Sequence, residues 1–282
     1  ITAISRSAER QDLFFISKGS ESVTLERWRK NGGWWGGTPT IGRNAAPGTS
    51  FGVVSRGSRK LEAFWARNDG ALMHAYTEND GDTWVRDQVL DRYSEAKPES
   101  ITAMSKDSSS AVVAWVTTRG ALMVARYEGN TWVKNQVLIP GSLFVNTRLA
   151  TLSISRNMMN IFFVGTDGMV YQSYWTSGMS NEKWTTTRIS NLGASVGGIS
   201  ATSMNIDHME VFWTHPSGTL HHAYWTKAQN SWSSEALPGS VGTNRCQPGS
   251  HIATVARVAK GTMEGWCRSI EGKLTHFYYY AK

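Results

Sequence analysis

The sequence predicts an all-β fold, a six-bladed β-propeller with four antiparallel strands per blade, and three observations lead to this prediction. Similar segments recur about every fifty residues along the chain. Each segment consists of short apolar runs, rich in β-branched and aromatic residues, separated by Gly, Asn and Asp turns. Amphipathic helical periodicity is absent. A four-stranded sheet cannot bury both of its apolar faces without neighbours, and radial repetition of such sheets gives a propeller.

The first run of each unit sets the repeat. The stretch "GALMHAYTENDGDTWVRDQVL", which begins at Gly70, returns fifty residues later as "GALMVARYEGNTWVKNQVL". Six segments open the units: "ITAISR", "FGVVSR", "ITAMSK", "LATLSIS", "ISATSM" and "IATVAR". We therefore expect a single propeller domain over 1–282, with blades at approximately 1–50, 51–100, 101–148, 149–198, 199–251 and 252–282.

The remaining strands of each unit follow in a fixed order. A second run ends in two bulky residues, as in "EAFWA" and "EVFWT", and a turn follows it, usually at Gly. A third run such as "LMHAYT" leads to a polar turn and a Trp on the fourth strand. We expect most of these aromatic side chains to fill the space between blades. The last unit stops after "KLTHFYYYAK", so its blade is either incomplete or completed by the N-terminus.

Composition and charge restrict the partners. The formal net charge is +7, which favours anionic or electron-rich ligands. The Lys and Arg residues are scattered and form no basic block, so we expect no nucleic-acid partner. No run of ~18 apolar residues occurs, so we expect no membrane-spanning helix.

The two cysteines, Cys246 and Cys267, lie 21 positions apart and match no zinc-site spacing. In a secreted protein they would form a disulfide, which by loop entropy would add roughly 3 kcal/mol. Buried free thiols are the alternative. The chain opens at Ile1 without Met, which is compatible with a removed leader or tag. We expect a protein that is secreted or held in the secretory-pathway lumen, although no N-x-S/T glycosylation site supports this.

Motifs for common enzyme chemistries are missing. The chain contains no GxSxG, HExxH, P-loop or dinucleotide-binding fingerprint, so no cofactor is expected. His221 and His222 are adjacent on a predicted strand and point to opposite faces, so they cannot chelate one metal together, and no metal site is expected. The stretch "TENDGDTW" from Thr77 to Trp84 looks like an Asp-box turn, whose side-chain hydrogen bonds stabilise the hairpin between strands three and four. Sialidases carry such boxes, but they also need an arginine cluster that this sequence does not provide.

The blade pattern, over nearly all of the chain, resembles the fungal fucose-specific lectins, a family of six-bladed propellers. In that family each pocket between blades uses an Arg on strand two, a Glu on strand three and aromatic residues, notably on strand four. The resemblance implies the fold and the position of the pockets. Here the Arg column contains Asp12, Glu62, Val112, Asn160, Glu210 and Glu264. The Glu column contains Leu25, His74, Val124, Gln172, His222 and His276. No unit keeps Arg with Glu, and a carboxylate that only accepts cannot replace an Arg fork, so fucose binding in the family's manner is not expected.

Three blades replace the lectin pair by a carboxylate and an imidazole. The three pairs are Glu62 with His74, Glu210 with His222, and Glu264 with His276. If the partners meet, each carboxylate would stabilise an imidazolium. One interpretation is a buried pair whose members satisfy each other. The other is a hydrogen-bonding or proton-transfer site for a small molecule.

Arginines also occur in the connections between blades, at Arg43, Arg92, Arg148 and Arg245. These are either solvated loop charges or a donor site for an anionic or carbonyl-bearing ligand. A further change separates the two nearly identical segments: His74 becomes Val124, and Tyr76 becomes Arg126. Positions that drift in this way indicate that only a few of the clefts between blades are functional.

Two function hypotheses follow. The first is an enzyme on a lectin-like frame, similar to fungal hetero-Diels–Alderases of secondary metabolism, which would join a tropolone-type quinone methide to a terpene alkene. Such a pericyclase needs neither nucleophile nor metal and works by holding a hydrophobic or aromatic small-molecule substrate in a reactive pose. The alternative is a carbohydrate-binding lectin whose glycan specificity is not that of the fucose triad. A structural or toxin-like interaction protein is a third possibility.

The same residues serve both main hypotheses. The expected catalytic residues are His74, His222, His276 and Arg126, as hydrogen-bond donors or proton carriers. The expected aromatic walls are Trp65, Tyr76, Trp84, Trp213, Tyr224, Trp232 and Tyr278. The expected polar ligand contacts are Glu62, Glu210, Glu264, Arg148 and Arg245.

Overall fold

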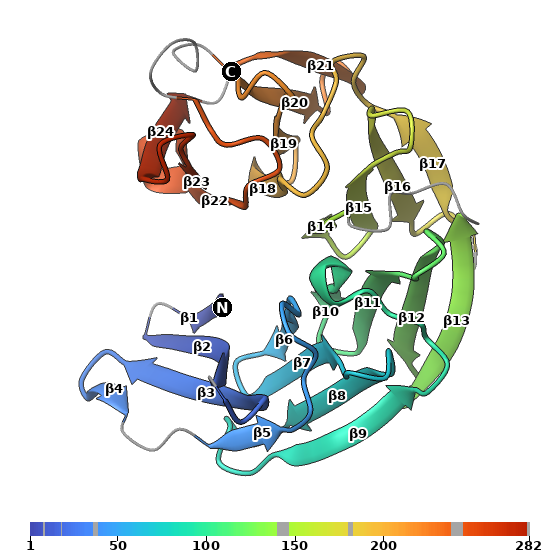
Figure 1. Ribbon diagram of the computed structural model, residues 1–282, viewed down its shortest axis with the longest axis vertical. Helices are drawn as coiled ribbons and strands as arrows, with labels where there is room; N and C mark the ends of the chain where they lie inside the picture. The colour runs from blue at the N-terminus through green and yellow to red at the C-terminus, as the bar shows by residue number, and fades with distance from the viewer. Residues whose placement is uncertain are drawn as a thin grey trace. The chain divides into compact units, whose positions relative to one another are not determined.

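The computed structural model describes residues 1–282 except 8, 18, 36–38, 140–146, 180–182, 238–244 and 281–282. The predicted fold class, an all-β six-bladed propeller, is confirmed: the strands form six separate antiparallel sheets that follow one another along the chain (Figure 1). Besides the strands, the described residues form two single-turn 3-10 helices, η1 (Pro98–Ser100) and η2 (Val258–Lys260). The chain divides into two compact units, Ile1–Gly141 and Ser142–Lys282, and each contains three of the sheets.

The first unit contains the first three blades. The first sheet consists of β1 (Thr2–Ser7), β2 (Arg10–Ser17), β3 (Ser22–Arg29) and β4 (Gly33–Trp35), with β5 (Thr40–Gly42) also paired to β3. The second consists of β6 (Gly52–Gly57), β7 (Lys60–Ala66), β8 (Leu72–Thr77) and β9 (Val85–Asp91). The third consists of β10 (Thr102–Asp107), β11 (Ser110–Val116), β12 (Leu122–Glu128) and β13 (Thr131–Ile139).

The second unit contains the other three blades. The fourth sheet consists of β14 (Ala150–Ser155), β15 (Met158–Val164), β16 (Val170–Thr176) and β17 (Thr185–Arg188). The fifth consists of β18 (Ile199–Asn205), β19 (His208–Thr214), β20 (Leu220–Thr226) and β21 (Ser231–Ala236). The sixth consists of β22 (Ile252–Arg257), β23 (Thr262–Arg268) and β24 (Leu274–Tyr280). This last sheet has three strands in the described part of the chain.

Burial differs between inner and outer strands, and the pattern explains the sequence. In the second blade, six of the seven residues of β7 are buried, whereas the first five residues of β9 are exposed. A strand covered on both faces by neighbouring blades needs apolar residues at consecutive positions, so runs such as "LEAFWA" do not alternate. The outer strand is solvated and carries polar residues.

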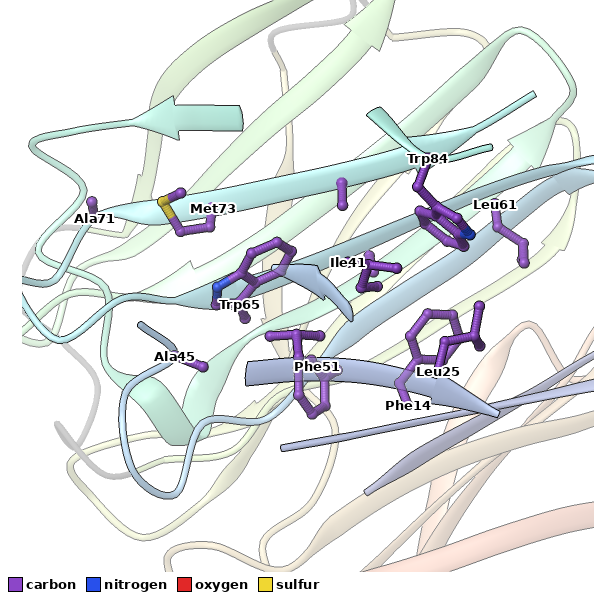
Figure 2. Packing of buried hydrophobic residues seen from close by; sticks show 13 residues of the cluster. Phe14, Leu25, Ile41, Ala45, Phe51, Leu61, Trp65, Ala71, Met73 and Trp84 are labelled. Atoms are coloured by element: carbon purple, nitrogen blue, oxygen red, sulfur yellow. The ribbon is translucent and has the colours of Figure 1, made fainter. Parts of the chain in front are cut away.

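The core between the first two blades contains several large aromatic side chains. Phe14, Leu25 and Trp84 gather at one end and Trp65 with Phe51 at the other (Figure 2). The Trp65 ring lies so close to the backbone of β5 that a Cβ at Gly42 would overlap its Cζ2 atom. Glycine is therefore required at this position by packing rather than by backbone conformation.

The predicted Asp-box turn is confirmed. The hydroxyl oxygen of Thr77 accepts a hydrogen bond from the backbone N–H of Gly81 at 3.0 Å. The Asn79 side chain accepts from the Thr83 N–H at 3.1 Å and donates to the Thr83 hydroxyl at 2.7 Å. These bonds close the connection between β8 and β9 as the sequence predicted.

The cysteine pair is also joined as predicted for an oxidising compartment. Cys246 and Cys267 form a disulfide with their Cα atoms 5.8 Å apart, and both residues are buried. The bond ties the segment before β22 to the end of β23. Among the described residues, none of the helical segments has the length and hydropathy that crossing a membrane requires.

Candidate functional site

A cleft between the second and third blades encloses a cavity of about 690 Å³. Both blades belong to the first unit. The second blade contributes residues of β6, β7, β8 and β9, and the third contributes the end of β12, the following turn and the start of β13. This is the position that the lectin resemblance implies for a ligand pocket.

Strand register places the polar residues on one face. Glu62 pairs with Tyr76, and Phe64 pairs with His74, so Glu62 and His74 are diagonal neighbours on adjacent strands. On its other side Glu62 pairs with Val54, which places Arg56 diagonally across from it on β6. Because side chains two residues apart share a face of a strand, Arg56, Glu62 and His74 meet in a row.

The row is a continuous array of charge-assisted contacts. Nε of Arg56 donates to Oε1 of Glu62, and Nε2 of His74 lies 3.1 Å from Oε2 of the same carboxylate. Arg56, Glu62 and His74 are only 4%, 1% and 5% exposed. A carboxylate buried to this degree needs a counter-charge and hydrogen bonds, and here it has both.

Aromatic rings surround this array. The guanidinium of Arg56 lies over the Tyr127 ring, 4.2 Å from its centroid, and Nη1 donates to the Ser108 carbonyl at 3.3 Å. The His74 ring stacks on Phe64 at 4.7 Å, and Trp132 meets His74 edge-on at 5.5 Å. The cleft therefore has a charged floor in the second blade and aromatic walls from the third.

The sixth blade repeats the array in a more solvated setting. Arg257 donates to Glu264, and Nε2 of His276 lies 3.5 Å from Oε2 of Glu264. The hydrogen bond from Arg257 lowers the pKa of the Glu264 carboxyl. His276 and Arg257 are about half exposed, with side-chain exposures of 48% and 44%. The same three residue types therefore form an open array on this blade.

In the fifth blade the array is closed. The Glu210 carboxylate lies between two histidines, with His222 Nδ1 at 2.5 Å and His208 Nε2 at 3.4 Å. Glu210 and His222 have no exposed surface, and Met204 occupies the place of the arginine. Burial lowers the pKa of His208, although the nearby Glu210 acts in the opposite direction. The pair of Glu210 and His222 is buried, as one of the two interpretations expected, although Oε2 of Glu210 has no hydrogen bond with good geometry among the described residues.

The fourth blade replaces the charges with amides. Gln172 donates to Asn160 at 2.7 Å and accepts from the indole N–H of Trp232 at 3.0 Å. Trp232 occupies the strand-four position that Trp132 occupies in the third blade. Its hydrogen bond closes the space above the amide pair. A smaller cavity of about 340 Å³ lies beside Trp232, along the end of β17.

The predicted site residues therefore separate into groups. Glu62, His74 and Tyr76 line the cleft, and each of the three Glu/His pairs is in contact as the sequence predicted. Trp65, Trp84 and Trp213 need correction as ligand walls, because they are buried in the cores between blades, at 0%, 9% and 0% exposure. Tyr224 lies two residues after His222 with its ring 5.8 Å away, and Tyr278 on the last strand is 64% exposed.

The predicted arginines do not line the cleft. Arg126 is buried on β12, with Nε 3.7 Å from Glu128. Arg148 donates to Nε2 of His251 at 2.8 Å, which connects the fourth blade's entry loop to the sixth's. Arg245 is half-buried beside Gly218 at the hairpin turn of the fifth blade.

The sequence interpretation missed Arg56 and Arg257. Both lie at or next to the end of the first strand of a blade, whereas the lectin pattern led us to expect arginines only on strand two. A signal was available, since the opening segments "FGVVSR" and "IATVAR" end in Arg at equivalent places. Compared with the lectin pattern, the guanidinium lies on strand one instead of strand two, and the carboxylate lies on strand two instead of strand three. An imidazole occupies the strand-three position.

Comparison with known proteins supports the fold. No known family profile matches the chain, and no curated protein matches it in sequence. Among solved structures it is similar to the BP39L lectin from Burkholderia pseudomallei, with a TM-score of 0.84 and 16% identity over 99% of this chain and 80% of that one. It is also similar to the SapL1 lectin in complex with alpha methyl fucoside (TM-score 0.70, 16% identity, 98% and 91% of the two chains). The fucose-specific lectin from Aleuria aurantia is a third (TM-score 0.62, 14% identity, 96% and 87%). All three are lectins by name, and the Aleuria aurantia lectin has a six-bladed β-propeller fold.

Proposed function

We propose that this protein is a carbohydrate-binding lectin whose principal site is the cleft between the second and third blades. The observation that carries the proposal is the open cavity of about 690 Å³ in which a buried Arg–Glu–His array faces aromatic side chains. Its volume falls in the range of small-molecule sites, ~300–1,000 Å³. The structural neighbours are lectins, and the names of two of them refer to fucose or a fucoside.

The chemistry of the cleft suits a pyranose ring. One face of such a ring presents C–H groups, which pack well on Trp132 or Tyr127. Its edges carry hydroxyls, which need charged or polar partners fixed in position. The contacts of Arg56 and His74 with Glu62 hold these groups in place before a ligand arrives, which reduces the entropy cost of binding.

The cycloaddition activity stays a prediction. The lectin neighbours give it no support, and Nε2 of His74, the expected proton carrier, is engaged with Glu62. Incubation of the protein with a tropolone precursor and humulene tests it: an adduct ratio or handedness different from the protein-free control would favour the enzyme. The disulfide between Cys246 and Cys267 supports a second part of the proposal, that the protein resides in an oxidising compartment and is secreted or lumenal.

A glycan array followed by calorimetry with the strongest ligand tests the lectin proposal. The variant Trp132→Ala should weaken binding by at least about tenfold, because it removes one aromatic wall. Trp34 occupies the equivalent position in the first blade, lies outside the cleft and is 54% exposed, so Trp34→Ala is the matched control and should bind normally. Absence of glycan binding, or equal effects of the two substitutions, would contradict the proposal.

A further inference from the structure

We infer that the cleft between the second and third blades selects a saccharide that carries a carboxylate, such as a uronic acid or a sialic acid. The inference rests on the proposed function, since it concerns which sugar that site takes. It comes from the balance of hydrogen-bond donors and acceptors around Arg56.

The Arg56 guanidinium has N–H donors that are not used by other residues of the described structure. It carries five N–H groups, of which Nε donates to Glu62 and one on Nη1 donates to Ser108. The second hydrogen of Nη1 and both hydrogens of Nη2 have no acceptor among the residues that the structure describes. Arg56 is nevertheless only 4% exposed, and it lines the cavity. A buried guanidinium with terminal hydrogens that lack an acceptor is set to receive one from a ligand.

The carboxylates of the cleft, in contrast, are already engaged. One oxygen of Glu62 accepts from Arg56 and the other from His74. At the rim, Glu78 lies 3.3 Å from the Lys60 ammonium. In the fucose-lectin arrangement implied by the sequence, the strand-three residue is a carboxylate, whereas here it is His74. A neutral sugar hydroxyl would donate as well as accept, but Arg56, the buried charged group with unused hydrogen-bonding capacity, can only donate.

A carboxylate fits such a site. It accepts only, and its two oxygens match the two terminal nitrogens of a guanidinium in a forked pair. Charge does not oppose this, because Arg56 and Lys60 balance Glu62 and Glu78. The net charge of +7 on the chain would also raise the local concentration of an acidic glycan. The sugar ring itself would still pack on the aromatic wall formed by Trp132 and Tyr127.

Paired ligands test the inference. Methyl β-D-glucuronide and methyl β-D-glucoside differ only by a carboxylate in place of a hydroxymethyl group, and the methyl glycoside of N-acetylneuraminic acid distinguishes a sialic acid from a uronic acid. Calorimetry of the whole protein should give at least a tenfold tighter Kd for one of the two acids than for the glucoside, as expected for hydrogen bonds between charged groups. The double substitution Arg56→Met with Glu62→Met removes both charges together and should abolish this preference.

Two further variants keep the result interpretable. Arg56→Lys retains the charge but loses the fork, so it should reduce the preference severalfold even if the double variant does not fold. Arg257→Met alters the equivalent arginine of the sixth blade, outside the cleft, and should leave the preference unchanged. A neutral glycan that binds as tightly as the acids, in a manner sensitive to Trp132→Ala, would overturn the inference and leave the lectin proposal standing. If no glycan binds, both are wrong.

Discussion

One carboxylate, that of Glu62, joins His74 on β8 to Arg56 on β6: Oε2 lies 3.1 Å from Nε2 of His74, and Oε1 accepts from the guanidinium. The three strands of the second blade are thereby connected by side chains as well as by backbone bonds. Removing the carboxylate therefore affects the fold as well as the ligand site.

Glu62→Ala should lower the free energy of unfolding by about 3–5 kcal/mol, because it leaves the guanidinium of Arg56 buried without its counter-ion. Urea denaturation followed by circular dichroism measures the change. Glu78→Ala is the control. Its pair with Lys60 is exposed, so a change within about 1 kcal/mol is expected. An equal decrease in the free energy of unfolding in the two variants would show that the buried contacts of Arg56, Glu62 and His74 do not stabilise the fold more than an exposed ion pair does.

Gly42→Ala should destabilise the first unit by about 1–3 kcal/mol, because the added methyl group would overlap the Trp65 ring in a closely packed core. Gly32→Ala provides the comparison, since nothing lies within 4 Å of the position of its Cβ. Thermal unfolding of the two variants measures the difference. A Gly42→Ala protein as stable as Gly32→Ala would mean that the backbone of β5 does not lie against Trp65.

Replacing both cysteines, Cys246→Ser with Cys267→Ser, should cost about 3 kcal/mol, because the crosslink restricts a loop of 21 residues in the unfolded chain. Reduction of the unaltered protein with dithiothreitol should lower its free energy of unfolding by a similar amount, and its unfolding temperature should fall accordingly. The reductant should have no effect on the double variant, which serves as the control. An unchanged melting temperature in both experiments would argue against a bond between these cysteines.

Stability should decrease as the pH falls below about 6.5, the ordinary pKa of histidine. Burial lowers the pKa of His208 and His221. The unfolded chain therefore binds protons at these two residues before the folded chain does, so acid favours unfolding as the pH falls below about 6.5. Urea denaturation at several pH values below about 6.5 measures how steeply the free energy of unfolding falls with pH. The substitution His221→Gln should make this dependence weaker. A stability that rises on acidification would contradict the assignment.

Much of the fold was predictable from the sequence because it depends on local patterns that repeat. Consecutive apolar residues on β7, the hydrogen-bonding side chains of the turn after Thr77, and the Glu–His spacing each determine a structure within one blade. Contacts inside a hairpin follow from the register of its two strands, and alignment of the six repeats shows this register in the sequence.

The site was less predictable because it depends on the neighbouring blade. Trp132 and Trp232 occupy the same strand-four position, and Trp84 directly precedes the fourth strand of its blade, yet the three residues have different roles. Trp84 fills the core beside Leu25 and Phe14, Trp232 donates to Gln172, and Trp132 borders an open cavity. The difference arises from the residues opposite each ring, which belong to another repeat. Arg56 was missed for a different reason: the lectin pattern places its arginine on strand two, whereas Arg56 lies on strand one.

The most direct test of the central claim is a crystal structure of the protein with the saccharide that binds most tightly in the array experiment. We predict a sugar ring between the second and third blades, packed on Trp132 or Tyr127 and with an oxygen within hydrogen-bond distance of the terminal nitrogens of Arg56. A ligand bound elsewhere, with this cleft unoccupied, would contradict the account.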